Sequence, residues 1–457
     1  MNMPSLALPA AAAYSETRQH ELRKTRMLMI DGNLAVNSRT AEGGVSARVY
    51  HDGYWGFASE PGADAPSAQR VADKAHRNAR EMARFGPRAV ASLPSGSYRG
   101  RHAFGGRPPL SQKECMDRLA ELHAWCQTRY PGLQSTRFML SDEHHAKWLA
   151  TSTGSEVLNS IQRALCYVTF VSEDDQGAPV EMRELLSTKG SLADLDLSVA
   201  ALAPALDRMH EHLQAKRHAV AARGGLHTVV LAPELAGMLA HEAVGHPCEA
   251  DIVLGGAVTG DLIGERVASE LVTMIDFAHH VGDAEAMIPV YADDEGMPSR
   301  DAVLIDRGRL TEFMSSRETA ARMGIAPTGS ARAYGPSDEP LVRMRNTAIL
   351  PGTHRLDEMI AGVDDGYLLM KTSNGQADST TEFMFGINLA YEIRGGRLGR
   401  AIRDTTLSGS AIKVLQTVDA VSDDMVWSCA GYCGKKQPMV VSMGGPALRA
   451  RAHLGGE

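Results

Sequence analysis

The amino-acid sequence predicts an α+β protein, with an N-terminal domain of mixed sheet and helix and a β-rich C-terminal domain built around one helix. Up to about residue 220, blocks of alternating apolar and polar residues are interleaved with segments of helical periodicity. Beyond that point, short glycine-punctuated strands surround a single apolar helix. We therefore expect a flexible leader over residues 1–25, an N-terminal domain over 26–222 and a C-terminal domain over 223–457.

The N-terminal domain begins with an expected meander of antiparallel strands over residues 27–59, where apolar and polar residues alternate. Ser67 is the expected N-cap of the next helix and Gly86 its terminator, while a second helix starts at Ser111 and stops at Pro131. In order, we expect helices over residues 65–86, 111–132 and 192–220, and strands over 136–140, 148–151 and 164–171.

The C-terminal domain begins with a short apolar strand and a helix that has Pro233 near its first position, where proline is well tolerated. The segments "IDRGRL" and "IRGGRL" predict hairpins that turn at Arg307-Gly308 and Gly395-Gly396. The remainder of this half is predicted to be mostly β-structure packed around the one helix.

The composition is that of an ordinary globular protein, with 44% hydrophobic and 22% charged residues among 457. A net charge of −8 argues against nucleic acid as a partner. No apolar run approaches the roughly 18 residues that a membrane span needs. The six cysteines are irregularly spaced, which predicts free or metal-bound thiols in a reducing compartment and a cytoplasmic protein.

The stretch "MLAHEAVGHPCEAD" contains two histidines with a glutamate beside the first. His241 and His246 are five residues apart, so on a straight α-helix they would be separated by about 140° around the axis. Gly245 tolerates unusual torsions, and the residue before Pro247 is pushed away from helical torsions. We therefore expect the helix to end or kink at Gly245-His246 and to return His246 toward His241. Glu242 is a charged residue on an otherwise apolar helix, so we expect it to have a polar partner or a functional role.

Two histidines leave a tetrahedral zinc site short of a third protein ligand. Cys429 and Cys433, in "SCAGYCGKKQP", are candidate thiolate donors, and the pattern alone does not choose between them. Cys248 lies too close to His246 in sequence to reach the same ion easily. The histidine pairs at 144–145 and 279–280 lack a matching carboxylate or thiol spacing and are expected in exposed loops.

The stretches "HEAVGHPCEAD" and "CGKKQPMVVSMGGP" resemble the TldD/PmbA family of zinc metallopeptidases. Further similar segments, among them "ARVYHDGYWGFAS", "IPVYADDEG" and "NGQADSTTEFMFGINLAYEI", extend the resemblance over nearly the whole chain. It is closest to the TldD type, because the TldE (PmbA) type lacks the histidine pair. "CGKKQPM" departs from the family's usual "CGK-x-G-Q" by losing a glycine, which reshapes the loop after the cysteine.

The resemblance implies that His241, His246 and Cys433 bind Zn²⁺, that Cys429 is structural, and that Glu242 is the general base. Zinc lowers the pKa of bound water toward about 7. The base then takes the water proton and hands it to the leaving amine.

Two acidic residues follow the second histidine. Glu249 and Asp251 are expected to orient the ligand imidazoles, with solvated loop acids or helix caps as the alternative. Tyr432, Tyr391 and Arg400 are candidates to stabilise the oxyanion, and the sequence does not select among them.

The resemblance further implies a peptidase that acts on unfolded or short peptides, including ribosomally made ones, inside a dimer chamber. Its partner would be a TldE/PmbA-type subunit or a second copy, and substrate would be held as an added β-strand. The alternative function is a non-proteolytic, metal-dependent tailoring enzyme of a peptide or natural-product pathway. A catalytically silent subunit is a third hypothesis, against which the intact histidine–glutamate motif argues.

Overall fold

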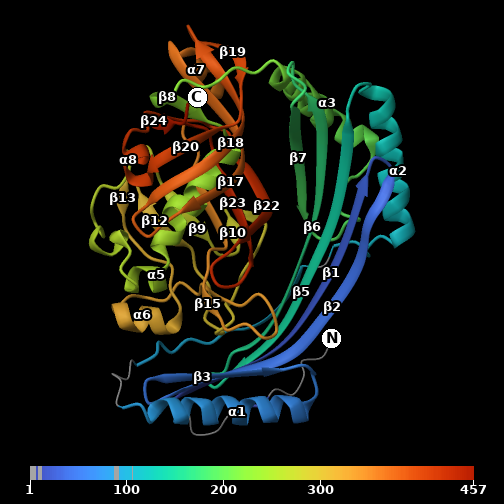
Figure 1. The fold of residues 1–457 in the computed structure, drawn as a ribbon. Coiled ribbons are helices and arrows are strands. Elements are labelled where there is room, and N and C mark those ends of the chain that lie inside the picture. Colours follow the sequence, from blue (N-terminus) through green and yellow to red (C-terminus); the bar gives the residue numbers. More distant parts are fainter. Residues whose placement is uncertain (1–6, 9–12, 87–91, 105, 457) are drawn as a thin grey trace.

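A computed structural model describes residues 7–8, 13–86, 92–104 and 106–456. A long curved sheet from the N-terminal part faces a second body formed by the C-terminal half (Figure 1). The predicted α+β class is confirmed, with strands more abundant than helices. Among the described residues, no helix combines the length and the apolar character needed to cross a membrane.

The N-terminal sheet has seven strands in the order β3-β2-β1-β5-β6-β4, with β7 paired to β6. All of its pairs are antiparallel except β4 with β6. The strands are β1 (Tyr14–Ile30), β2 (Asn33–His51), β3 (Tyr54–Glu60), β4 (Arg99–Phe104), β5 (Ser135–Thr151), β6 (Glu156–Glu173) and β7 (Pro179–Lys189).

Two expectations for this sheet need correction. The flexible leader does not reach residue 25, because β1 begins at Tyr14; residues 1–6 and 9–12 lie outside the described part of the chain. The strands expected separately over 136–140 and 148–151 are one strand, β5. The single strand was not predicted because its middle is polar, which is typical of a loop. In the structure Glu143 and His145 of this polar stretch are buried in the strand and hydrogen-bonded to one another.

Helices α1 (Ala65–Ala83), α2 (Gln112–Arg129) and α3 (Val199–Arg217) cover parts of this sheet (Figure 1). The N-cap of α1 is Asp64, whose side chain accepts a hydrogen bond from the Ser67 backbone, so Ser67 itself lies inside the helix. Alanines on the buried face of α1 allow close approach to β3: a Cβ on Gly56 would lie 2.1 Å from the Ala75 carbonyl oxygen. Helix α2 begins as predicted after Ser111.

The C-terminal half contains two main sheets. One has six strands in the order β13-β12-β9-β16-β23-β22. The other has seven strands, six of them in the order β17-β8-β24-β20-β18-β19, and its seventh strand, β21, pairs with β24. Their strands are β8 (Gly225–Leu231), β9 (Met274–Phe277), β12 (Ala302–Asp306), β13 (Arg309–Leu310), β16 (Asn346–Ile349), β17 (Asp365–Ala377), β18 (Glu382–Arg394), β19 (Arg397–Ile402), β20 (Thr405–Ser410), β21 (Ala420–Val421), β22 (Val426–Cys433), β23 (Met439–Gly445) and β24 (Leu448–Leu454).

Smaller elements complete this half: the pairs β10 (His280–Val281) with β11 (Ala284–Glu285) and β14 (Ala331–Arg332) with β15 (Leu341–Val342), and helices α4 (Pro233–Met238), α5 (Ala250–Leu254), α6 (Arg317–Met323), α7 (Leu356–Ala361) and α8 (Ala411–Gln416). His279 and His280 are half-buried here, not in an exposed loop. Both predicted hairpins are confirmed, as β12–β13 and β18–β19. Their turns have positive φ at both central residues, as a mirror-image turn requires.

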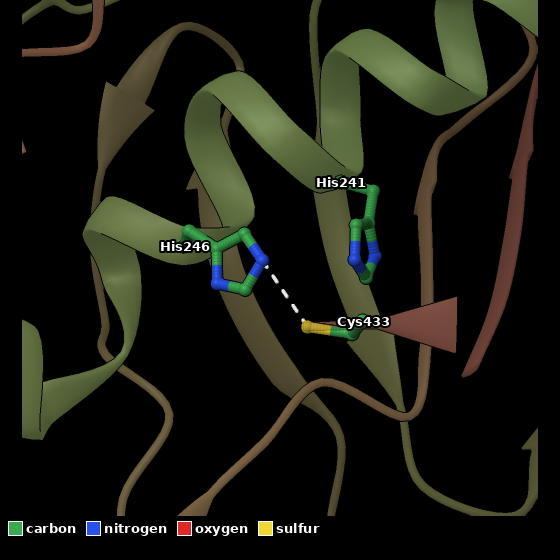
Figure 2. A group of neighbouring side chains, drawn as sticks. All are labelled: His241, His246 and Cys433. Atoms are coloured by element: carbon green, nitrogen blue, oxygen red, sulfur yellow. Dashed lines mark hydrogen bonds between the residues drawn. The ribbon is translucent and has the colours of Figure 1, made fainter. Parts of the chain in front are cut away.

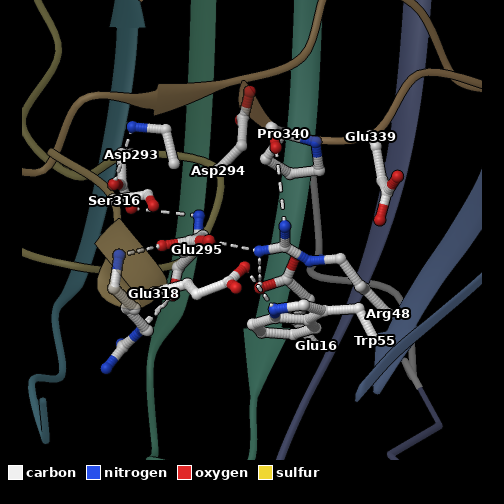
Figure 3. Close-up of polar contacts among 12 residues, drawn as sticks. Glu16, Arg48, Trp55, Asp293, Asp294, Glu295, Ser316, Glu318, Glu339 and Pro340 are labelled. Carbon is white, nitrogen blue, oxygen red and sulfur yellow. Dashed lines mark hydrogen bonds and ion pairs between the residues drawn. The ribbon is translucent and has the colours of Figure 1, made fainter. Parts of the chain in front are cut away.

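A buried cluster of charged side chains joins the two halves at one end of the long sheet (Figure 3). The Arg48 guanidinium lies between two carboxylates, with Nε 3.0 Å from Glu16 and Nη2 paired to Glu295 of the C-terminal half. The backbone N–H of Arg317 donates to the same Glu295 at 2.7 Å. Because removing one partner of a buried ion pair leaves an uncompensated charge, loss of any one of these side chains is expected to destabilise the contact between the sheet and the C-terminal half.

Candidate metal centre

The histidine motif lies on a helical segment whose winding changes along its length. Strand β8 leads into α4, which has Pro233 at its first turn as predicted. The segment then widens to a π-helix over Leu239–Gly245 and tightens to a 3₁₀ turn over His246–Cys248. The His246 N–H donates to the His241 carbonyl, a bond between residues five apart. One wide turn thus brings residues of this spacing to the same side of the segment.

The expectation that the helix ends or kinks at Gly245-His246 holds in part: the π-helix ends at Gly245, but the chain continues into a 3₁₀ turn without leaving helical torsions. Both residues keep helical torsions, with φ and ψ of −58° and −50° for Gly245 and −60° and −49° for His246. Widening of the turn, not its interruption, compensates for the extra residue. The glycine serves packing: a Cβ at position 245 would lie 2.3 Å from the sulfur of Met344. The chain leaves helical geometry only at Glu249, where ψ is 121°.

His241, His246 and Cys433 come together in space, with one candidate ligand atom from each lying within 4.8 Å of the others (Figure 2). Cys433 is the last residue of β22, and its Sγ lies 3.1 Å from the Nε2 of His246. Cys429 and Cys248 are buried but outside this cluster, and all six cysteines are free.

The donor set suits zinc. The His241 side chain is 1% exposed, yet neither of its ring nitrogens has a hydrogen-bond partner among the described residues. Buried polar atoms are normally satisfied, so an orphaned imidazole beside a thiol calls for a further partner. Two imidazole nitrogens and one thiolate are ligands that zinc accepts in tetrahedral sites, with a fourth position left for water.

The electrostatics favour a deprotonated thiol. Burial alone would raise the pKa of Cys433, but the neighbouring His241 and His246 stabilise the thiolate and lower the pKa to about 5. Burial opposes a charge on His246, yet the Glu249 carboxylate and Cys433 raise its pKa well above the usual value. The side chains around Cys433 therefore favour the thiolate form of its sulfur.

Behind the cluster, Glu249 orients the second histidine. Its carboxylate is fully buried and lies 2.9 Å from the Nδ1 of His246. Burial raises the pKa of Glu249, but His246 and Lys435 overcome this and hold it at about 2. The Nζ of Lys435 lies 3.1 Å from Glu249 and 2.9 Å from both oxygens of Asp251. Of the two acids expected behind the imidazoles, Glu249 contacts a histidine and Asp251 contacts the lysine instead.

Replacing Glu249 by glutamine is expected to lower zinc affinity by about 10–100-fold, the usual effect of losing an outer partner of a metal-bound histidine. The amide keeps the shape of the side chain but not the charge that favours an Nδ1–H on His246. Competition with a chromogenic chelator measures the affinity. Asp251→Asn is the matched control, because Asp251 pairs with Lys435 and not with an imidazole; equal losses in both variants would contradict the orienting role.

Glu242 lies at the open side of the cluster. Its carboxylate oxygens are 3.9 Å from the Nε2 of His241 and 3.8 Å from the Nε2 of His246. The side chain is 21% exposed. A carboxylate held beside the candidate ligands and open to solvent can accept a proton from a water molecule at that position.

The N-terminal sheet contacts the strand that carries Cys433, and the sequence did not predict this contact. Arg163 of β6 is buried, and its guanidinium donates to the carbonyls of Cys429 and Gly431 in β22. It also pairs with Glu143 of β5 at 3.1 Å, and Tyr432 donates to the same carboxylate at 2.5 Å. The one signal in the sequence was the run of polar residues inside β5.

The three residues considered for stabilising the oxyanion lie in different parts of the structure. Tyr391 is hydrogen-bonded to His212 of α3 at 2.7 Å, and Arg400 pairs with Glu392 on the neighbouring strand. Tyr432 directly precedes Cys433 in β22, but its hydroxyl donates to Glu143 of the N-terminal sheet. The fold and the cluster together define a class: a two-part α+β protein with a candidate zinc site between a helix and a strand of its C-terminal half.

Comparison with known proteins agrees with this class. The family model described as "PmbA/TldA metallopeptidase C-terminal domain" matches residues 224–454, and "PmbA/TldA metallopeptidase domain 1" matches residues 15–79. A metalloprotease of Methanothermobacter thermautotrophicus is 30% identical, over 97% of this chain and 95% of its own. The zinc metalloprotease TldD homolog of Saccharolobus solfataricus is 28% identical, over 96% of each chain. The chain belongs to the PmbA/TldA metallopeptidase family.

Solved structures share the fold. TldE from Thermococcus kodakarensis superimposes with a TM-score of 0.73 at 17% identity, over 96% of both chains. A protein of Thermotoga maritima described as a putative modulator of a DNA gyrase gives a TM-score of 0.75 at 18% identity, with the same coverage. At these identities the likeness concerns the fold alone.

Proposed function

We propose that this protein is a zinc-dependent peptidase that hydrolyses unfolded or short peptides, ribosomally made ones among them. The observation that carries the proposal is the convergence of His241, His246 and Cys433 beside the carboxylate of Glu242. The relatives named as metalloproteases support the same reaction class.

Each residue has a role that follows from its contacts. Glu249 accepts a hydrogen bond from the Nδ1–H of His246, which leaves Nε2, on the side of Cys433, as the nitrogen that would bind the ion. A zinc ion bound by His241, His246 and Cys433 would polarise the scissile carbonyl and lower the pKa of a water molecule toward about 7. Glu242 accepts the proton from the attacking water and delivers it to the departing amine nitrogen.

We further propose that the working unit is a dimer that encloses the site, with a TldE/PmbA-type subunit or a second copy as the partner. The support is the shared fold of a solved structure named TldE over nearly the full length of both chains. The cytoplasm is the proposed location, supported by six free cysteines.

Metal analysis and a cleavage assay test the function together. We expect purified protein to hold about one zinc per chain and to cleave unfolded casein or a fluorogenic peptide, alone or mixed with a TldE-type subunit. A chelator should abolish cleavage, and added zinc should restore it. Zinc-loaded protein that cleaves no peptide in any pairing would favour the tailoring enzyme, and protein unable to bind zinc would favour the silent subunit.

A further inference from the structure

Arg343 is a buried cation whose hydrogen bonds all go to one short loop. It lies between β15 and β16, is 0% exposed, and has its own backbone N–H bonded to the Ser330 carbonyl at 2.9 Å. Among the described residues it forms no ion pair with a carboxylate. The Glu249 carboxylate is near enough for the Arg343 charge to lower its pKa, but the two side chains do not pair directly. A buried guanidinium without a paired carboxylate is costly, so its hydrogen bonds have to compensate for lost water.

Those hydrogen bonds converge on the loop that follows Cys433. Nη2 donates to the carbonyl of Cys433 at 2.5 Å, and Nη1 donates to the carbonyls of Lys435 and Gln437 at 2.9 and 2.8 Å. Three carbonyls of alternate residues thus face one planar group. Only arginine offers donors fixed in a rigid fork, and the charge strengthens each bond.

The loop needs such an anchor because its backbone is strained. Lys436 has a φ of +59°, a left-handed torsion that costs energy for a residue with a side chain. Position 436 holds a lysine and not a glycine, which would adopt the torsion readily. Contacts outside the loop must therefore hold its shape.

Resting on the proposed function, we infer that Arg343 is a positioning residue for the metal centre: it fixes the backbone after Cys433 so that the thiolate faces His241 and His246. The same anchor positions Lys435, whose ammonium reaches Glu249 behind His246. Arg343 forms no hydrogen bond with the side chains of His241, His246 or Cys433, and its hydrogen bonds reach the site through the backbone of the loop.

Cobalt binding tests this role without an activity assay. Thiolate-bound Co²⁺ has a near-ultraviolet sulfur-to-metal charge-transfer band, which reports whether Cys433 coordinates. We expect wild type to show the band, and Arg343→Met to lose most of it and to bind Co²⁺ at least about tenfold more weakly, as for loss of other outer supports. Arg343→Lys, which cannot span three acceptors in a plane, is expected to weaken binding as well, with part of the band retained.

Arg332→Met is the matched control. Arg332 lies in the neighbouring strand β14, is 5% exposed, and donates to the Met344 carbonyl but to no loop carbonyl. The Arg332→Met variant loses a buried guanidinium of the same size, so its charge-transfer band and its Co²⁺ affinity should stay as in wild type. Circular dichroism establishes that each variant is folded.

The outcomes separate this inference from the proposed function. A full band in folded Arg343→Met, or wild-type affinity in Arg343→Lys, overturns the positioning role. Equal losses in Arg332→Met and Arg343→Met overturn it too, because the effect would then be general destabilisation. If Arg343→Met does not fold, the comparison of Arg343→Lys with Arg332→Met decides. A wild-type protein without any charge-transfer band would instead remove Cys433 from the ligand set.

Discussion

Replacing Glu242 by glutamine is expected to leave zinc bound at wild-type stoichiometry while lowering kcat/KM for peptide cleavage by about 10²–10⁴-fold, the usual contribution of a general base. Glutamine has nearly the same shape, and Glu242 is not among the three residues expected to bind the ion. Its amide cannot accept a proton from water. Zinc analysis and steady-state kinetics on the same preparation measure both quantities.

The result has a clear control within the same helical segment. Glu234 of α4 has a side chain that is 51% exposed and is not part of the cluster, so Glu234→Gln should retain nearly full activity. If Glu242→Gln cleaves peptide at the wild-type rate, the general base is another group. If it also loses zinc, its carboxylate belongs to the coordination sphere and the assignment of roles has to change.

The sequence predicted which side chains of the helical segment converge better than it predicted the winding of that segment. A histidine pair with an intervening glutamate was enough to predict a metal site, because the residue types themselves carry that information. The return of His246 toward His241 was predicted, but it comes from a widened turn and not from an interruption of the helical torsions. Glycine relaxes and proline restricts the torsions of their own neighbourhood, whereas widening to a π-helix depends on how the whole segment packs. At Gly245, for example, an added Cβ would lie 2.3 Å from the sulfur of Met344. A single sequence does not contain that packing explicitly.

Residues that act from a distance were the least predictable. Arg163 and Arg343 lie 266 and 90 residues from the carbonyls of Cys429 and Cys433 that they bind. A buried arginine bonded to backbone carbonyls leaves no spacing pattern, because its partners are peptide groups and not particular side chains. For the same reason β5 was predicted as two short strands, because its polar middle resembles a loop between them. The contacts of these polar residues with β22 become visible only in the folded structure.

The identity of the third ligand is the assignment on which the rest of the site depends. From spacing alone Cys429 and Cys433 were equal candidates, and the family resemblance favoured Cys433. Both lie in β22, both are buried, and four residues separate them. The structure brings only the Cys433 sulfur close to the two imidazoles.

Cys433→Ala is therefore expected to lower zinc affinity by more than the about 100-fold typical of losing an outer partner, and to abolish peptide cleavage at ordinary zinc concentrations. Cys429→Ala removes an equally buried thiol from the same strand and should lose stability without losing zinc. Metal analysis after dialysis against a weak chelator, with thermal unfolding as the check on folding, distinguishes the two. Full zinc in Cys433→Ala would remove the thiolate from the site. The two histidines would then need another donor, and Glu242, at 3.8–3.9 Å from both imidazoles, would be the first carboxylate to test.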